Sequence, residues 1–415
     1  MSINSSKYQP RIYPVNGEGA PAEIDRAQSI DPTTALNRDK IEEIGRDGVV
    51  GFVKRSPTVT YRMTQLEYGS MEFWRKITNK ADSVNTITLD DFKTPTFDIA
   101  AFLTDDDGTF RGTLVYPKLR TSGFSINISD PDATIERTFD LVGEQHLVWQ
   151  GANKYYIHVE HTAGSGNDDV VDLSARTPVI DPDIDVSKTD AEKYIHRVVR
   201  IRSGVSTELD LSSDVTYNTG TEELTILDVQ TGDIFKTWHT SSAAPATLFT
   251  PNDTDPSALN ADSAEIFLYL PASGSPTQSD KILRLQSATI DVTFDREDLK
   301  EIGNSQVVQR SVIDSTVNVT LGRILEQFTI EEVLRGEAPG YGKIDVEKLT
   351  DNASLIIKIY EDNTKTTLKY GFKADNLSPT DLSNSAAINA NVNQENTIEG
   401  ESLIISSDNA QLGNF

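Results

Sequence analysis

RDKIEEIGRDGVV at residues 38–50 and REDLKEIGNSQVV at residues 296–308 are two versions of one segment. Gly45 matches Gly303, so the two versions lie 258 residues apart. The same offset holds without a gap from residue 24 to residue 59 and contains twelve identical pairs in 36 positions. Ordinary residue usage gives about two or three such pairs by chance. The sequence therefore predicts an internal repeat.

A period of this length indicates a duplicated domain, because solenoid repeats recur every ~20 to 50 residues. A chain of 415 residues is also long enough for two or three domains. We divide it into an extended N-terminal arm (1–25), a first copy (26–145), an intervening β-rich domain (146–285), a second copy (286–407) and a polar C-terminal tail (408–415).

Both copies contain a long segment in which polar and apolar residues alternate, as they do in half-buried strands. The polar positions are Thr58, Thr60, Arg62 and Thr64 in the first copy and Asp314, Thr316, Asn318 and Thr320 in the second. We expect each set to share one face of a sheet, with the apolar residues between them facing a core.

A short helix is expected after each of these strands, over 71–77 and 330–335. Ser70 and Thr329 are the predicted N-caps, because a side-chain hydroxyl at that position accepts a backbone N–H bond. Hairpins are predicted at 97–116 and 353–372. The predicted fold is mainly β: two copies of a β-sandwich or barrel with one short packed helix each, and a β-rich domain between them.

Composition excludes several classes of function. There are 64 Asp and Glu against 38 Lys and Arg, giving a net charge of −26. Such a balance disfavours tight binding of nucleic acid or of an anionic membrane, both of which need clustered basic residues. The absence of cysteine excludes disulfides, cysteine-based metal sites and cysteine nucleophiles. No apolar run approaches the length of a membrane span, and the first residues do not look like a secretory leader.

Catalytic motifs are also missing: there is no nucleophile elbow, phosphate-binding glycine loop or zinc-protease signature. We expect no enzyme activity and no cofactor. One weak calcium candidate has the spacing of a calcium loop, with Asp181, Asp183 and Asp185 followed by Glu192 at the twelfth position. Val186 stands where such a loop needs glycine, so a solvated acidic linker is the simpler interpretation.

The two copies resemble tail tube proteins of long-tailed phages and related tailed viruses. The resemblance is carried by EIG followed by VV at 43–50 and 301–308, by the alternating strands (58–64 and 313–321), by the capped helices and by the hairpins. It covers about 240 of the 415 residues and leaves out the intervening region.

This resemblance implies a virion structural protein whose sheets join edge to edge into stacked rings, forming a hollow conduit for genome ejection. Family members with two tube domains per chain form trimeric rings with pseudo-sixfold symmetry. The implied location is the viral tail, after synthesis in the host cytoplasm. The implied partners are further copies, the tape measure, terminator and baseplate or tip proteins, and viral DNA in transit; no membrane is implied. The eight alternating polar residues would then face an acidic lumen that repels phosphate.

Two other classes of function stay open. The chain could be another structural protein of a tail or capsid, or a secreted acidic β-sandwich that binds a glycan or calcium. The lack of a leader disfavours the secreted protein. Ordinary solvent exposure explains the polar strand faces as well as a lumen does.

Overall fold

The computed structural model describes residues 8–24, 26–42, 49–105, 107–129, 132–164, 168–244, 258–271, 277, 280–282, 285–300, 307–325, 328–336, 343–349, 352–386 and 391–413. Glu43, Ile44 and Gly45 of the repeated motif, and Glu301, Ile302 and Gly303, lie outside these ranges. Within them the protein is mainly β, with four sheets and a few short helices. No helix in the described part combines the length and apolarity needed to cross a membrane.

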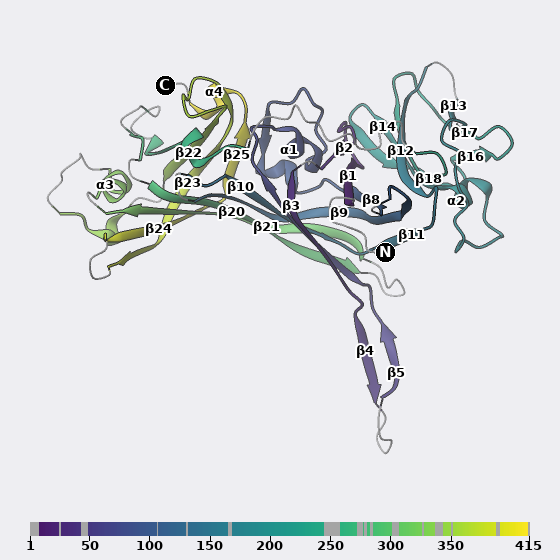
Figure 1. Cartoon of the computed structure of the whole chain (residues 1–415), viewed down its shortest axis with the longest axis horizontal. Helices are drawn as coiled ribbons and strands as arrows, with labels where there is room; N and C mark the ends of the chain where they lie inside the picture. Colours follow the sequence, from purple (N-terminus) through teal and green to yellow (C-terminus); the bar gives the residue numbers. More distant parts are fainter. Residues whose placement is uncertain are drawn as a thin grey trace.

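Most elements of the two repeats correspond and follow in the same order, but the second repeat begins with two longer strands and ends with an additional helix (Figure 1). The first has β3 (Ala27–Ala35), β4 (Arg38–Glu42), β5 (Val49–Lys54), β6 (Thr58–Leu66), α1 (Glu72–Ile77), β7 (Thr86–Thr88), η2 (Leu89–Phe92), β8 (Phe97–Thr104), β9 (Phe110–Ser129), β10 (Glu136–Gly143) and β11 (Leu147–Gln150). The second has β20 (Leu285–Lys300), β21 (Val307–Ile324), α3 (Thr329–Arg335), η6 (Val346–Lys348), β22 (Ala353–Tyr360), β23 (Leu368–Ser385), β24 (Asn393–Gly400), β25 (Ser402–Ser406) and α4 (Asn409–Leu412).

The strand pairing repeats with the offset of the sequence. Ile30 faces Met63 in the first repeat, and Ala288 faces Leu321 in the second, each 258 residues further along. Shifts in register also recur at matching places, Ile41/Glu42 and Leu299/Lys300. The repeat therefore holds in the hydrogen-bonding register as well as in the sequence.

Each repeat is a two-layer structure in which one long strand belongs to both layers. The first half of β9 pairs with β8 and β11, and its second half pairs with β10 and β20. The strand changes layer at a bulge, where the Ser122 hydroxyl donates to the Asp140 carbonyl over 3.0 Å. In β23 the counterpart Thr380 hydroxyl donates to the Thr397 carbonyl over 3.2 Å.

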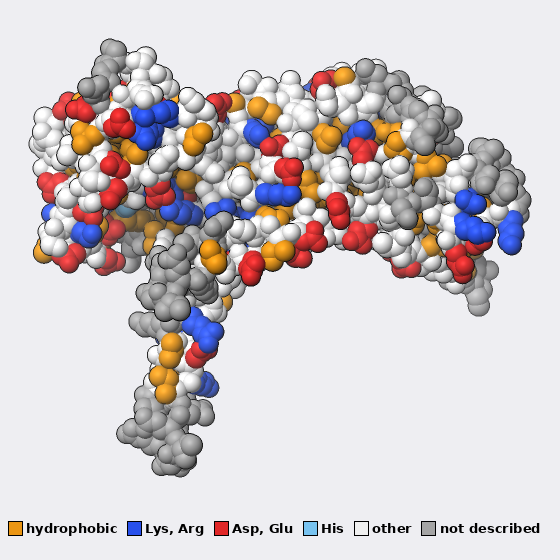
Figure 2. Space-filling view, turned by 180° about the vertical axis from the view of Figure 1, so that it is seen from behind, with side chains coloured by type: hydrophobic (Ala, Val, Ile, Leu, Met, Phe, Trp, Pro, Cys, Tyr) orange, Lys and Arg blue, Asp and Glu red, His pale blue; other side chains and the backbone are white. Residues whose placement is uncertain are grey.

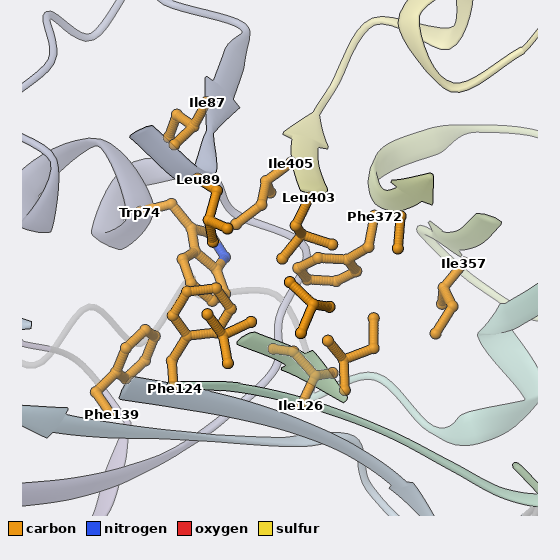
Figure 3. Close-up of a cluster of buried hydrophobic side chains, with 14 of the residues drawn as sticks. Trp74, Ile87, Leu89, Phe124, Ile126, Phe139, Ile357, Phe372, Leu403 and Ile405 are labelled. Carbon is orange, nitrogen blue, oxygen red and sulfur yellow. The ribbon is translucent and has the colours of Figure 1, made fainter. Parts of the chain in front are cut away.

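The inner layers of the two repeats form one continuous sheet with the strand order β23-β24-β21-β20-β9-β10-β6-β3. The strands β20 and β9 join the repeats, with Ile290 facing Ile126. Above this sheet lies a shared core in which Trp74 of α1 packs against Phe124 and Phe139 of its own repeat and against Phe372 of the other (Figure 3). We refer to β20, β9 and this core contact as the internal junction.

The N-terminal segment was expected to be an extended arm. It is extended, but it joins the chain's own outer layer: β1 (Tyr8–Pro14) pairs with β8, and β2 (Ala22–Glu23) pairs with β1. Ile12 of β1 is fully buried. The apolar alternation of this strand is short and interrupted by prolines, which is why the sequence pattern did not reveal it.

The intervening region contains two small sheets. Its elements are β12 (Tyr155–Thr162), β13 (Asp169–Asp172), α2 (Asp190–Tyr194), β14 (Ile195–Arg202), β15 (Val205–Glu208), β16 (Val215–Asn218), β17 (Glu223–Ile226) and β18 (Ile234–Ser241). Tyr156 and Trp238 pack with Trp149 against the outer layer of the first repeat. Farther along, after η3 (Ala261–Ser263), β19 (Ala264–Tyr269) pairs with β22 of the second repeat, although it precedes the boundary predicted at residue 285.

The helix starts differ by one residue from the prediction. Helix α1 begins at Glu72 with Met71 at the cap position, and the Ser70 hydroxyl accepts the Glu72 N–H bond over 3.1 Å. Helix α3 begins at Thr329 itself, so Phe328 occupies the cap position assigned to Thr329. Gly336 ends α3 with a φ of 73°, a left-handed conformation that glycine adopts freely.

Candidate functional site

The inner sheet has one face that the helices do not cover, which we call the open face (Figure 1). Burial alternates along its strands, so Thr58, Thr60, Arg62 and Thr64 of β6 lie on this face while the residues between them face the core. In β21, Thr316, Asn318 and Thr320 lie on it too, and exposed Asp314 continues the series. The eight predicted polar positions thus share one surface.

The apolar alternation expected around residue 313 is wrong at Ile313. This side chain is 67% exposed. The pairing of β20 with β21 shifts between Asp295 and Arg296, so that Asp295 faces Asp314 and Arg296 faces Val312. Ile313 is the extra residue of this bulge and has no partner in the pairing.

Carboxylates gather on the open face. Asp31 of β3, Asp140 of β10 and Asp291 of β20 lie on it, as do Glu395 and Glu399 of β24. In Figure 2 the underside of the molecule is hollowed, and acidic side chains line its margin. The other positions are mainly hydroxyl and amide side chains, which offer no strong charge to an anion.

The charges interact across neighbouring strands. Arg62 Nε lies 3.7 Å from Asp140 Oδ1, and both side chains are largely exposed. Burial raises the pKa of Asp291, and the nearby Asp140 carboxylate raises it further. The carboxylates of this surface repel polyphosphate.

Both ends of the inner sheet are unpaired in the described part of the chain. At one end β3 pairs only with β6. At the other end the second half of β23, from Ser378 to Ser385, pairs only with β24. Exposed strand edges of this length promote association unless another strand covers them. The corresponding edges inside the chain, of β20 and β9, cover each other at the internal junction.

An arginine stabilises the internal junction through hydrogen bonds. Arg296 of β20 donates to three carbonyl oxygens of the first repeat: Nε to Thr121 at 2.9 Å, Nη1 to Lys93 at 3.0 Å and Nη2 to Phe92 at 3.0 Å. Arg296 is one of the residues identical in both repeats, its counterpart being Arg38. The sequence shows that the two arginines are identical, but it does not show that Arg296 binds carbonyl oxygens of the first repeat.

A hairpin of β4 and β5 projects away from the sheet (Figure 1). It exposes Ile41, Phe52 and Val53, with Phe52 at 56%. Apolar side chains on a projecting hairpin are typical of a contact with another molecule.

The weak calcium candidate is not assembled into a ligand set. Asp181 and Asp185 accept backbone N–H bonds from Asp183 and Ser187 in separate turns. Glu192 forms the capping box of α2 with Thr189. Within the described residues, no group of three potential metal ligands comes together here or elsewhere.

Comparisons with known proteins add little. No protein-family model matches the chain, and no curated protein matches it. Among solved structures, a chain from a cryo-electron microscopy structure of the anti-feeding prophage baseplate is similar over 36% of this chain and 97% of its own length. The identity is 10% and the TM-score is 0.28.

Proposed function

We propose that the protein is a virion structural protein, a tail tube subunit without catalytic activity. Chains associate head to tail through the edges of their inner sheets, and three chains supply six repeats to a closed ring. Stacked rings form a hollow tube through which viral DNA passes into the host.

The observation that carries the proposal is the complementarity of the two unpaired edges. Strand β3 is the counterpart of β20, and the second half of β23 is the counterpart of the second half of β9. Since β20 and β9 pair within the chain, β3 and β23 present the same pair of edges to neighbouring chains. Heterologous contacts of this kind close into rings when the rotation between units permits.

The open face supports the same proposal. In a closed ring the inner sheet becomes a wall, with the helices outside and the open face towards the axis. Its hydroxyl, amide and carboxylate side chains then line the channel. DNA slides past such a lining because the carboxylates repel its phosphates, and Arg62 on the same face lies 3.7 Å from the Asp140 carboxylate.

Electron microscopy tests the proposal directly. Purified protein, raised in concentration and then seeded with preformed tube ends from virions, is expected to form rings or tubes with a central hole in negative stain. Sedimentation velocity measures the same association in solution. A protein that stays monomeric under both conditions contradicts the proposal.

A further inference from the structure

We infer that the internal junction is the template for the junction between chains, so that β3 of one chain pairs with β23 of the next in one specific register. The inference rests on the proposed function, because it takes the occupant of both edges to be a second copy of this chain. Beyond that function, the inference specifies the register between β3 and β23 and the side chains that come into contact between neighbouring chains.

The register follows from the offset of the repeat. At the internal junction Asp291 faces Ser125 and Thr289 faces Asn127. Moving each residue by 258 positions places Thr33 opposite Ser383 and Asp31 opposite Ser385. The offset of 258 holds at both edges. The residue pairs of β3 with β6 recur 258 positions later in β20 with β21. The bulge in β23 likewise lies 258 positions after the bulge in β9.

A second strand pairing between the two repeats, beside the internal junction, also has a counterpart at the chain's outer edges. Strand β7 pairs with β25, where Ile405 faces Ile87 and is almost fully buried. The counterpart of β25 is β11, since Ser406 faces Gly371 and Trp149 faces Thr113. In the described part of the chain β11 pairs only with β9.

Exposed apolar side chains lie on both halves of this second contact. On β11, Leu147 and Val148 are 41% and 63% exposed. The counterpart of β7 is 343–345, because η2 begins directly after β7 and η6 begins at Val346. Ile344 then corresponds to Ile87 and is half-buried, and Val346 directly after it is 54% exposed. Pairing 343–345 of one chain with β11 of the next brings Ile344 opposite Val148, as Ile87 lies opposite Ile405. Such pairing removes apolar side chains from water, which favours association.

The arginine of the internal junction has its counterpart in Arg38. Arg38 lies exposed on β4, at the position from which Arg296 reaches the Thr121 carbonyl. The carbonyl 258 residues after Thr121 is that of Pro379 in β23. Arg38 of one chain is therefore placed to donate to Pro379 of the next, beside the β3–β23 pairing.

Cysteine cross-linking tests the register, and the absence of native cysteine removes any background. Two double variants match the inferred register: Thr33→Cys with Ser383→Cys, and Asp31→Cys with Ser385→Cys. Two crossed variants recombine the same positions: Thr33→Cys with Ser385→Cys, and Asp31→Cys with Ser383→Cys. A disulfide requires closely facing residues, so the matched variants are expected to link about tenfold more than the crossed ones under mild oxidation.

The outcomes separate the register from the function. Cross-links that end at the size of three chains, in the matched variants only, support the inference. Rings or tubes in which the crossed variants link best, or in which no pair links, overturn the register and leave the proposed function standing. Chains that neither associate nor link overturn both.

Two single variants without cysteine test the contact of Arg38 with Pro379 and the contact at β11. Arg38→Ala and Val148→Asp are each expected to raise the concentration needed for ring formation about tenfold. Arg55→Ala is the control, since Arg55 lies exposed near Arg38, pairs with Asp39 and has no counterpart in the internal junction. Equal assembly by Arg38→Ala, Val148→Asp and Arg55→Ala contradicts the inferred contacts.

Discussion

The Tyr370 hydroxyl of the second repeat donates a hydrogen bond to the Glu67 carboxylate of the first. Both side chains are fully buried, and Glu67 also forms an ion pair with Arg137, whose Nη1 lies 3.3 Å from Glu67 Oε2. Trp74 Nε1 points at the same hydroxyl from 3.4 Å. The Glu67 carboxylate is thus buried at the boundary between the repeats, and it has a partner in each of them: Arg137 in the first and Tyr370 in the second.

Tyr370→Phe is expected to lower the free energy of unfolding by about 1–3 kcal/mol, because it removes a donor from a buried carboxylate. Urea denaturation followed by tryptophan fluorescence measures the change. Tyr194→Phe, on the half-buried Tyr194 of α2, is the control and should stay within ~0.5 kcal/mol of the native protein. Equal midpoints for the two variants would contradict the role given to Tyr370.

Stability should fall on acidification because of histidines in the intervening region. Burial lowers the pKa of His158 to about 3, that of His239 to about 3 and that of His196 to about 4. Above pH ~6.5 these groups are neutral in both states. Below it the unfolded chain binds protons that the folded chain does not, so the free energy of unfolding decreases as the pH falls towards 4.

His158→Phe is expected to weaken this pH dependence, because the ring at 158 then no longer binds a proton on unfolding. Thermal unfolding at pH 7 and pH 4.5 measures the slope. His161→Gln is the control, since His161 is half-exposed and hydrogen-bonded to Asp169 over 3.0 Å. A slope unchanged in His158→Phe would show that this histidine does not control acid stability.

Positive charge on the open face should impede DNA. Thr316→Lys with Asn318→Lys is expected to slow genome ejection, or to make assembled tubes retain short duplex DNA at low salt, because phosphates bind clustered lysines. Assembly should persist, since both residues lie on the open face and not at an edge. Val186→Lys, at a site 89% exposed outside the inner sheet, controls for added charge. Identical DNA retention in the two variants would contradict the channel.

The exposed apolar side chains of the projecting hairpin should act in stacking, whereas Arg38 at the base of the hairpin acts in ring closure. Phe52→Ser with Val53→Ser removes the exposed apolar side chains of β5. Rings are then expected to form at the usual concentration while tubes become shorter, as measured by particle length in negative stain. Loss of rings together with tubes would place the hairpin in the ring contact instead.

Local patterns predicted the alternating strands and the hairpins of both repeats. The hairpins of β8 with β9 and β22 with β23 follow from apolar runs on either side of polar turns, and Gly336 ends α3 because glycine adopts positive φ freely. The polar face of β6 and β21 follows from strict alternation. These features depend on neighbouring residues alone.

Features that depend on distant parts of the chain were not predictable. The bulge that exposes Ile313 depends on the partner strand, and the strand at Tyr8–Pro14 is specified by β8. The joining of two repeats through β20 and β9 needs the full topology. Arg296 and Arg38 were noted as identical, yet only the three carbonyl contacts of Arg296 suggest a role for the pair.

In the proposed ring, the covalent link between the repeats also changes the kinetics of assembly. The junction of β20 with β9 forms while a single chain folds, at the high effective concentration that a tether provides. Every second junction of a ring is then complete before two molecules meet. Ring formation becomes a reaction of three bodies where separate repeats would need six, and its rate depends on a correspondingly lower power of the protein concentration.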